Sequence, residues 1–349
     1  MVNRGDLVNG PNSGLWSNPG LIDRIVCPAC KHQIIWNSLA GECQACRRKF
    51  PIEDGIPILL RDRTLAGGDE IEHEHLGYKQ AQATYFDREI MARFERDRPR
   101  GAPALHRWLL EKKFLIGTRA VSSMLPGSTV LVVCGGSGMD GDFLAQVGAR
   151  VITSDISLGA AQRAAERATT YGLQYGSIVA DIEELPIMDR GVDVAYVHDG
   201  LHHLASPLIG LAEMIRVTSI AMVVTEPAKA RLTRLAMKVG LALEFEDAGN
   251  RVERMEAKAI GARLEENGFK ILTSRRYAMF YRHRPGAPTR ALSLPGLLSL
   301  AKLVSLAGIR VSGRFGNKLT VQAARDRGDS TGASTGLHQS QKDSTHARA

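Results

Sequence analysis

The sequence predicts an α/β protein in which a doubly wound, mostly parallel sheet of seven strands follows a small cysteine-rich β module. Three observations support this prediction. Apolar strand segments alternate with helical segments between residues 129 and 225, two Cys-x-x-Cys pairs lie near the N-terminus, and a glycine-rich loop (VVCGGSGMDG, 132–141) ends the first strand. Buried strands that alternate with helices are typical of a parallel sheet covered on both faces.

Composition divides the 349 residues into one large domain, a small satellite and two polar ends. The first twenty residues are rich in Asn, Gly, Pro and Ser, and the last segment is rich in Ser, Thr, Gly and Gln, so both ends are expected to be disordered. We therefore expect a disordered N-terminus (1–20), a zinc-binding module (21–61), a charged helical linker (62–124), an α/β domain (125–325) with an insertion at about 282–316, and a disordered tail (326–349).

Each element of the α/β domain has a local signal. A turn at Pro126-Gly127 precedes the first apolar strand, and another turn at Gly268 precedes a late strand. A helical stretch is expected from 229 to 267. The predicted strands are 129–133, 150–154, 177–180, 192–197, 220–225, one that begins at 268, and 317–322, and two further helices are predicted at 158–169 and 207–215.

Charge and hydropathy indicate which partners and which cellular location to expect. The 45 Lys and Arg residues outnumber the 37 Asp and Glu residues, which favours RNA, phosphorylated substrates or an anionic membrane surface as partners. Aromatic residues make up only 5%, which disfavours a base-stacking platform and favours the alternative, a soluble enzyme with a mildly basic surface. We find no signal-peptide pattern and no bilayer-spanning apolar run, and we expect a cytoplasmic protein. The segment 291–311 is predicted to be an amphipathic packing helix, with membrane-surface attachment as the alternative.

Four of the five cysteines form a C-x2-C-x12-C-x2-C pattern. Two thiolates on one tight knuckle can face a single tetrahedral ion, and a second knuckle closes the site. A pair of disulfides is the alternative, which a reducing cytoplasm disfavours. Because four thiolates leave no open coordination position, we predict a structural Zn²⁺ ion. The predicted ligands are Cys27, Cys30, Cys43 and Cys46.

The segment FPIEDGIPILL (50–60) follows these cysteines and contains an Asp54-Gly55 turn between two apolar strands. It resembles the closing segment of the small zinc-binding proteins that activate RNA and protein methyltransferases, and the resemblance covers residues 21–61. It implies a module that docks on a methyltransferase.

The glycine loop alone does not identify the cofactor. Gly136, Gly138 and Gly141 spell the pattern of a nicotinamide-dependent reductase, with Asp155 at a suitable distance to bind ribose hydroxyl groups. An acid at that position serves S-adenosylmethionine (SAM) enzymes equally well, so it does not discriminate between the two. A reductase would also require a catalytic pair such as Tyr-x-x-x-Lys, and we find none near the right strand end.

Further motifs favour SAM. The chain from 125 to about 284 resembles the class I SAM-dependent methyltransferases, in particular the methyltransferase type 11 branch that includes quinone-biosynthesis enzymes. ADIEELPI (180–187), VDVAYVHDGLHHL (192–204) and EENGF (265–269) carry the resemblance. It implies a Rossmann-like sheet and a lid helix near Tyr85-Phe86-Asp87, for which core packing is the alternative. The implied SAM-binding residues are Gly135, Gly136, Gly138, Asp155, Ile156, Asp181, Ile182 and His198.

The first motif departs from the family pattern at two positions. The family's acid, which helps to hold the methionine amino group, falls on Val132, and its first loop glycine falls on Cys134. Asp140 or Asp142 could replace the missing acid, although either could equally be a partner of the helix dipole.

The predicted activity is SAM-dependent methyl transfer to a small-molecule or carrier-linked acceptor. A general base is required only if the acceptor must lose a proton, and the candidates at the carboxyl edge of the sheet are His198, Asp199, His202 and Glu226. His198 is the first choice because it closes the fourth strand and histidine is the residue type best suited to exchange protons at physiological pH. For His202, packing or capping at a helix start is the alternative, and for Glu226 the alternative is substrate binding. An RNA methyltransferase and a non-catalytic, degenerate SAM-binding protein remain the alternative functions, and a homo-oligomer is compatible with the sequence.

Overall fold

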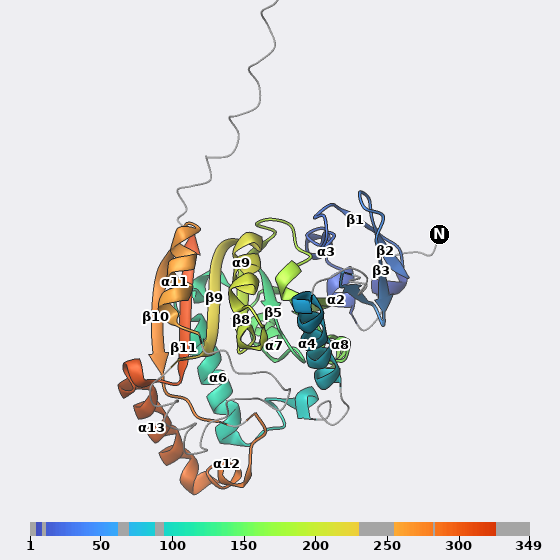
Figure 1. Ribbon diagram of the computed structural model, residues 1–349. Helices are drawn as coiled ribbons and strands as arrows, with labels where there is room; N and C mark the ends of the chain where they lie inside the picture. The colour runs from blue at the N-terminus through green and yellow to red at the C-terminus, as the bar shows by residue number, and fades with distance from the viewer. Residues whose placement is uncertain are drawn as a thin grey trace, which may run out of the picture.

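A computed structural model describes residues 5–8, 12–61, 70–87, 94–229, 255–281 and 283–325. Its strands form one continuous order, β1-β2-β3-β4-β7-β6-β5-β8-β9-β11-β10 (Figure 1). The predicted tail at 326–349 and much of the helical stretch expected at 229–267 lie outside the described residues.

Seven of these strands form the sheet of the α/β domain. Strands β7, β6, β5, β8 and β9 run parallel, and β11 pairs antiparallel with both β9 and β10. The prediction of a doubly wound, mostly parallel sheet is therefore confirmed. The seven strands are β5 (Thr129–Val133), β6 (Arg150–Asp155), β7 (Tyr175–Ala180), β8 (Val192–His198), β9 (Thr218–Pro227), β10 (Phe269–Tyr277) and β11 (Lys318–Arg325).

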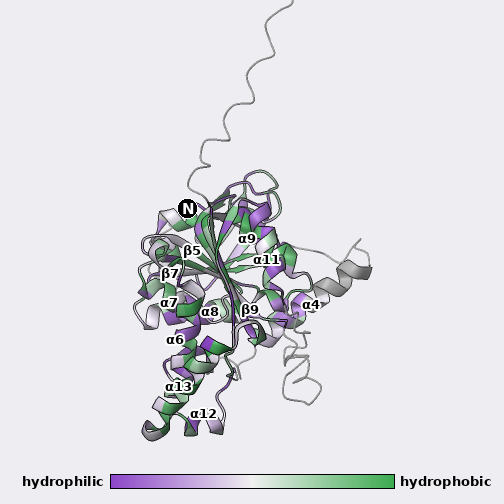
Figure 2. Cartoon of the chain, turned by 90° about the vertical axis from the view of Figure 1, so that its left-hand side faces the viewer, coloured by the Kyte–Doolittle hydropathy of each residue, from purple (hydrophilic) through white to green (hydrophobic). Residues whose placement is uncertain are grey.

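Alternate residues of the central strands face two helix layers. In β5, Leu131 and Val133 share a core with α9 and α11, whereas Val130 and Val132 share a core with α6, α7 and α8. Figure 2 shows the sheet between these layers. The helices are α6 (Ala104–Thr118), α7 (Met139–Gln146), α8 (Leu158–Thr170), α9 (Pro207–Val217) and α11 (Ala257–Glu266), with 3₁₀ turns η1 (Ser122–Met124), η2 (Ile182–Glu184), η3 (Leu201–His203) and η4 (Gly313–Phe315).

The cysteine module is continuous with the large sheet. Strands β1 (Ile34–Trp36), β2 (Ala40–Cys43) and β3 (Lys49–Glu53) form an antiparallel meander that continues into β4 (Ile56–Leu59). Strand β4 then pairs in parallel with β7, so that it covers the edge of the seven-stranded sheet. An edge strand that is covered in this way no longer exposes its backbone hydrogen-bonding groups.

The prediction that residues 1–20 are disordered is wrong for the described part of that segment. Short helices α1 (Gly5–Val8), α2 (Ser13–Trp16) and α3 (Pro19–Ile22) are present, and the side chains of Leu15 and Trp16 are buried. The Asn12 side-chain amide donates to the backbone oxygen of Ser177 at 2.8 Å and to that of Gly55 at 3.0 Å. These long-range contacts order a segment whose polar composition suggested disorder.

Two helical segments flank the carboxyl edge of the sheet. Helix α4 (Glu70–Asp87) packs on α8, and the insertion forms α12 (Ala287–Ala291) and α13 (Pro295–Val311), which lie beside α6 and β10 (Figure 1). Within the described ranges, no helix is both long and apolar enough to cross a bilayer.

Candidate functional site

The glycine loop connects β5 to the N-terminus of α7. Gly136 (φ 51°) and Gly138 (φ 84°) adopt the left-handed backbone conformation that glycine tolerates. A Cβ atom at Gly138 would lie 2.9 Å from the Cβ atom of Ala164, so a side chain has no room there. The turn brings the first backbone N–H groups of α7 to the carboxyl edge of the sheet, where they favour an anionic or polar ligand group.

The two departures from the family pattern have different structural consequences. Val132 is buried in the core between the sheet and α7, so no polar side chain occupies its position. Cys134 has φ 50°, a left-handed backbone conformation that glycine adopts more readily than cysteine. Burial raises the pKa of the Cys134 thiol well above its ordinary value, which keeps it neutral.

Asp155 ends β6 and holds the glycine loop in place. Its carboxylate accepts hydrogen bonds from the backbone N–H groups of Gly136, at 2.8 Å, and of Ser157, at 3.0 Å. Burial raises the pKa of Asp155, and these backbone N–H groups offset that increase only in part. The predicted ribose-binding acid is thus fixed by two backbone contacts.

Asp181 caps the short η2 turn that follows β7. Its carboxylate accepts the backbone N–H of Glu183 at 2.9 Å, and Lys79 of α4 lies 2.5 Å from both the Asp181 and the Glu183 carboxylates. Asp87 at the end of the same helix accepts hydrogen bonds from the Ser157 hydroxyl and the Gly159 N–H. Helix α4 therefore links the Asp181 side of the site to the Asp155 side.

A cavity of about 440 Å³ brings most of the predicted residues together. It lies at the carboxyl ends of the parallel strands, where ligands bind in open α/β sheets. His202 lines the cavity, whereas Gly138 and Glu226 are not among its lining residues. The predicted SAM-binding residues in its lining are Gly135, Gly136, Asp155, Ile156, Asp181, Ile182 and His198.

His198 forms a buried pair with Asp140. The His198 Nδ1 atom lies 2.9 Å from Asp140 Oδ1, and the Tyr196 hydroxyl donates to the same oxygen at 3.1 Å. Burial raises the pKa of Asp140, but His198 and the nearby cations outweigh this effect and lower it. An ionised Asp140 fixes the proton of a neutral imidazole on Nδ1, which leaves the lone pair on Nε2.

Asp199, a further candidate base, is surrounded by cations. Its carboxylate lies 2.8 Å from Lys318 Nζ and forms an ion pair with the buried Lys113, which also donates to the Tyr281 hydroxyl at 3.0 Å. These cations hold the pKa of Asp199 well below its usual range, despite burial. Lys113 and Lys318 are about two hundred residues apart in the chain, so no local motif could reveal this network.

Glu226 and His202 lie together at the end of β9. The fully buried Glu226 carboxylate accepts backbone N–H groups from Gly200 at 2.9 Å and Leu201 at 2.7 Å, and it lies 2.8 Å from His202 Nδ1. Its oxygens thus hold the loop that follows β8.

Asp142, the second candidate to replace the missing acid, faces away from the cavity. Its carboxylate lies 2.5 Å from both Arg100 and Arg167 and accepts the Tyr175 hydroxyl at 2.9 Å. Asp140 does line the cavity, whereas Asp142 is not among its lining residues.

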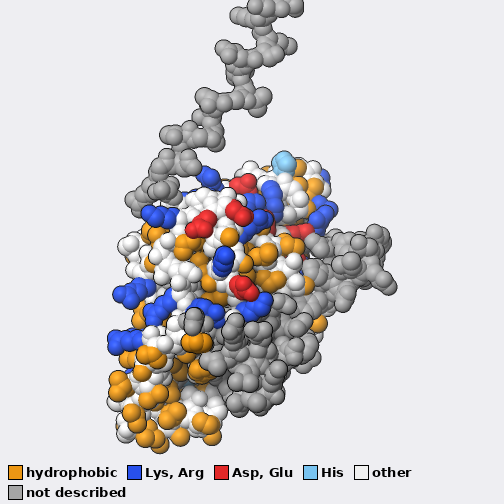
Figure 3. Space-filling model, turned by 60° about the vertical axis from the view of Figure 1, so that its left-hand side comes forward, with side chains coloured by type: hydrophobic (Ala, Val, Ile, Leu, Met, Phe, Trp, Pro, Cys, Tyr) orange, Lys and Arg blue, Asp and Glu red, His pale blue; other side chains and the backbone are white. Residues whose placement is uncertain are grey.

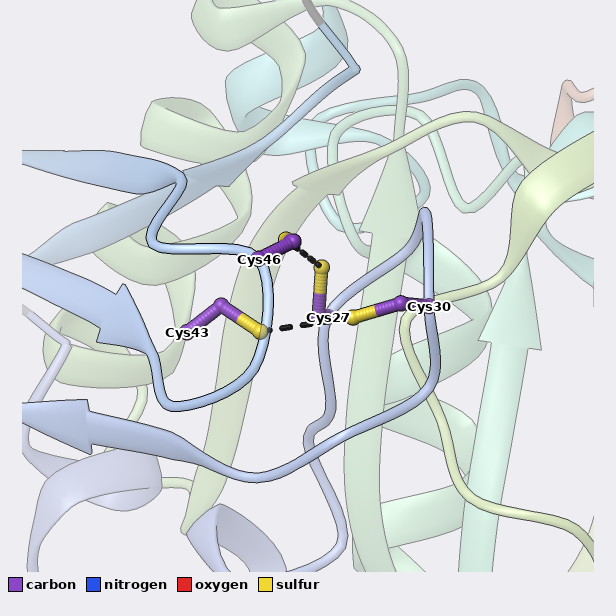
Figure 4. A group of neighbouring side chains, drawn as sticks. All are labelled: Cys27, Cys30, Cys43 and Cys46. Atoms are coloured by element: carbon purple, nitrogen blue, oxygen red, sulfur yellow. Dashed lines mark hydrogen bonds between the residues drawn. The ribbon is translucent and has the colours of Figure 1, made fainter.

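The four clustered cysteines face one point from two knuckles (Figure 4). Cys27 Sγ lies 3.6 Å from Cys46 Sγ, and Cys30 Sγ lies 3.4 Å from Cys43 Sγ. Sulfur atoms that surround a zinc ion tetrahedrally at about 2.3 Å are about 3.8 Å apart, whereas disulfide sulfurs are about 2.05 Å apart. The spacing and chemistry of the donors fit a structural zinc ion, as predicted.

The α/β domain and the N-terminal module each match known proteins. Residues 130–219 match the family described as "Methyltransferase domain". The N-terminal part is 47% identical over 47 residues to a UPF0434 protein of Nitrosospira multiformis, and it covers 77% of that protein and 13% of this chain.

Two further proteins resemble the larger domain. A demethylmenaquinone methyltransferase of Corynebacterium urealyticum is 34% identical over 101 residues, which are 29% of this chain and 41% of that enzyme. The structure of magnesium protoporphyrin IX methyltransferase from Synechocystis with bound S-adenosylhomocysteine (SAH) is 21% identical, with a TM-score of 0.48 over 71% of this chain and 100% of that chain. The match at 130–219, the glycine loop with Asp155, and the four-cysteine centre lead to one assignment: the chain is a SAM-dependent methyltransferase whose N-terminal zinc module belongs to the UPF0434 family.

Proposed function

We propose that the protein transfers a methyl group from SAM to a small-molecule or carrier-linked acceptor, with His198 as the general base. The observation that carries this proposal is the His198–Asp140 pair in the wall of the cavity. Asp140 holds Nδ1, and Nε2 lies 3.7 Å from the Asp199 carboxylate, which is beyond hydrogen-bond distance. The Nε2 lone pair can therefore accept a proton from an acceptor hydroxyl, amine or acidic carbon.

The residues around the cavity divide into binding and positioning groups. SAM supplies an electrophilic methyl group when it is bound. Asp155 would accept the two ribose hydroxyl groups, and Asp181 with the backbone of Ile182 would bind the adenine edge. Glu226 would act as a positioning residue, because its carboxylate fixes the loop that carries His202.

The cofactor part of this proposal is tested by calorimetric titration with SAM, SAH, NADH and NADPH. We expect SAM and SAH to bind and both nicotinamide cofactors to fail. Asp155→Ala should abolish binding, because it removes both the ribose acceptor and the contact that holds Gly136. The matched control is Asp189→Asn, which changes a surface carboxylate that is 75% exposed. Binding that survives Asp155→Ala would overturn the assignment of this residue.

The catalytic part is tested with His198→Gln and a pool of small metabolites. We expect SAH binding to change little, while methyl transfer from labelled SAM falls by about 10²- to 10⁴-fold, as is typical for loss of a general base. The exposed His32 provides the control variant His32→Gln, which should keep full turnover. Unchanged turnover in His198→Gln would exclude His198 as the base.

A further inference from the structure

The outer face of α13 is apolar and exposed. Leu300, Val304 and Val311 are 60%, 63% and 81% exposed, and Leu297 and Leu303 are exposed as well. With 3.6 residues per turn, these side chains and Ala307 fall within one continuous arc of the helix. The arc contains no polar side chain, so solvent meets an uninterrupted apolar stripe along the helix.

The opposite face of α13 already has a partner within the chain. Ala301 and Ile309 are buried in a cluster with Leu105 and Leu109 of α6. Arg275 of β10 donates to the backbone oxygen of Ile309 at 2.9 Å, which ties the end of the helix to the sheet. The helix is therefore held firmly by one face, while none of the described residues covers its apolar outer face.

The exposed apolar surface continues beyond both ends of the helix. Leu292 and Leu294 precede α13, and Phe315 follows it, and all three side chains are more than 40% exposed. Figure 3 shows hydrophobic side chains gathered over α12 and α13 at the lower end of the molecule. A contiguous patch of this kind is typical of an interaction site, because isolated soluble domains rarely expose one.

The charge of the surrounding chain indicates what covers this patch. Between Phe269 and Arg325 the sequence contains eleven Lys and Arg residues and no Asp or Glu. Arg290 of α12 and Arg310 of α13 are exposed, and Arg310 borders the apolar arc. An apolar stripe flanked by cations matches a surface that is apolar inside and anionic outside.

We propose that α13 docks the protein on an anionic lipid bilayer, with the apolar arc in the headgroup region and the flanking arginines on lipid phosphates. A second copy of the chain fits less well. Pairing two α13 helices would bring the cations of both copies together without a carboxylate from this segment to neutralise them. The bilayer both covers the apolar stripe and neutralises the cations.

The test is co-sedimentation of the full-length protein with lipid vesicles. One vesicle set is phosphatidylcholine alone, and the other contains about one quarter phosphatidylglycerol. We expect binding to the anionic set that weakens with added salt and is much weaker on the neutral set. Leu300→Asp combined with Val304→Asp should lower the partition coefficient at least about tenfold. The control Leu39→Asp changes a leucine of the zinc module that is 71% exposed, and it should bind normally.

A second variant keeps the proposal testable if the aspartates perturb folding. Arg290→Glu with Arg310→Glu leaves the apolar arc intact and should lower binding to anionic vesicles only. Circular dichroism and SAH titration check that each variant is folded. The proposal is overturned if the wild-type protein binds neither vesicle set or binds both sets equally. It is also overturned if the protein forms a dimer in solution that the Leu300/Val304 variant dissociates, while vesicle binding is absent.

Discussion

Leu59 of β4 pairs in parallel register with Ala180 of β7, the residue directly before Asp181. Further along, the Val26 N–H donates to the Pro186 backbone oxygen at 2.9 Å, so the zinc module holds both ends of the segment that carries Asp181. Strands gain stability from such pairing, and the pairing fixes the direction in which the strand end points. The zinc module therefore supports the segment that carries Asp181 from behind, although none of its own residues is among those that line the cavity.

Loss of zinc should consequently weaken cofactor binding. Cys27→Ser removes a ligand from a site whose metal-binding free energy is on the order of 10 kcal/mol, so we expect the module to unfold and the SAH affinity to fall. Zinc content by elemental analysis should drop from one ion per chain to none, and the thermal midpoint should fall.

The fifth cysteine provides the control for zinc content. Cys134→Ser changes a thiol outside the four-cysteine cluster and should retain one zinc ion per chain. If Cys27→Ser loses its zinc but binds SAH as tightly as the wild type, the module does not support the Asp181 segment.

Helix α4 should control the rate at which cofactor leaves. Lys79 contacts the Asp181 and Glu183 carboxylates, and Asp87 caps the N-terminus of α8 beside Asp155. Lys79→Met combined with Asp87→Ala removes both attachments, so the SAH dissociation rate should rise about tenfold or more, at a cost of roughly 0.5 to 1.5 kcal/mol for each hydrogen bond.

Stopped-flow displacement of SAH measures this rate, and hydrogen exchange of the α4 amides reports how often the helix detaches. Gln80→Ala changes an exposed position on the same helix and serves as the matched control. An unchanged dissociation rate in the double variant would show that α4 does not retain the cofactor.

The sequence predicted those parts of the site that depend on local chain geometry. The glycine loop, Asp155 at a strand end and the two cysteine knuckles are short motifs, and the structure places them as expected. Pairing between distant segments is not encoded in local periodicity. The β4–β7 pairing and the packing of Trp16 therefore escaped prediction, although β4 carries an apolar pattern typical of a buried strand.

The contacts around His198 also join residues that are distant in the sequence, so local patterns did not predict them. Asp140 appeared as one of two candidate acids, and only the fold shows that it contacts His198 while Asp142 contacts arginines. Lys113 gave no signal in the sequence because it lies on an ordinary amphipathic helix, α6, and its burial results from the packing of that helix on the sheet.

Stability between neutral and mildly acidic pH should depend on His106 of α6. The ring is buried between Phe94 and Tyr281, and among the described residues neither ring nitrogen has a hydrogen-bond partner. Burial, together with the nearby Arg98 and His283, lowers the pKa of His106 from 6.5 to about 4. Below pH 6.5 the unfolded chain therefore binds a proton that the folded chain does not bind until about pH 4.

The free energy of unfolding should fall as the pH decreases through that window, by on the order of 3 kcal/mol in total. Glu95, whose pKa is lowered from 4.5 to about 2, acts in the same direction only below about pH 4.5. Zinc binding by the four cysteines also weakens as the pH falls, so the effect of His106 is the difference between the wild type and His106→Phe in urea unfolding at about pH 7 and about pH 5. In His106→Phe this part of the pH dependence should disappear, because the aromatic ring fills the site and binds no proton. If His106→Phe loses stability between these two pH values as steeply as the wild type, another group carries the proton.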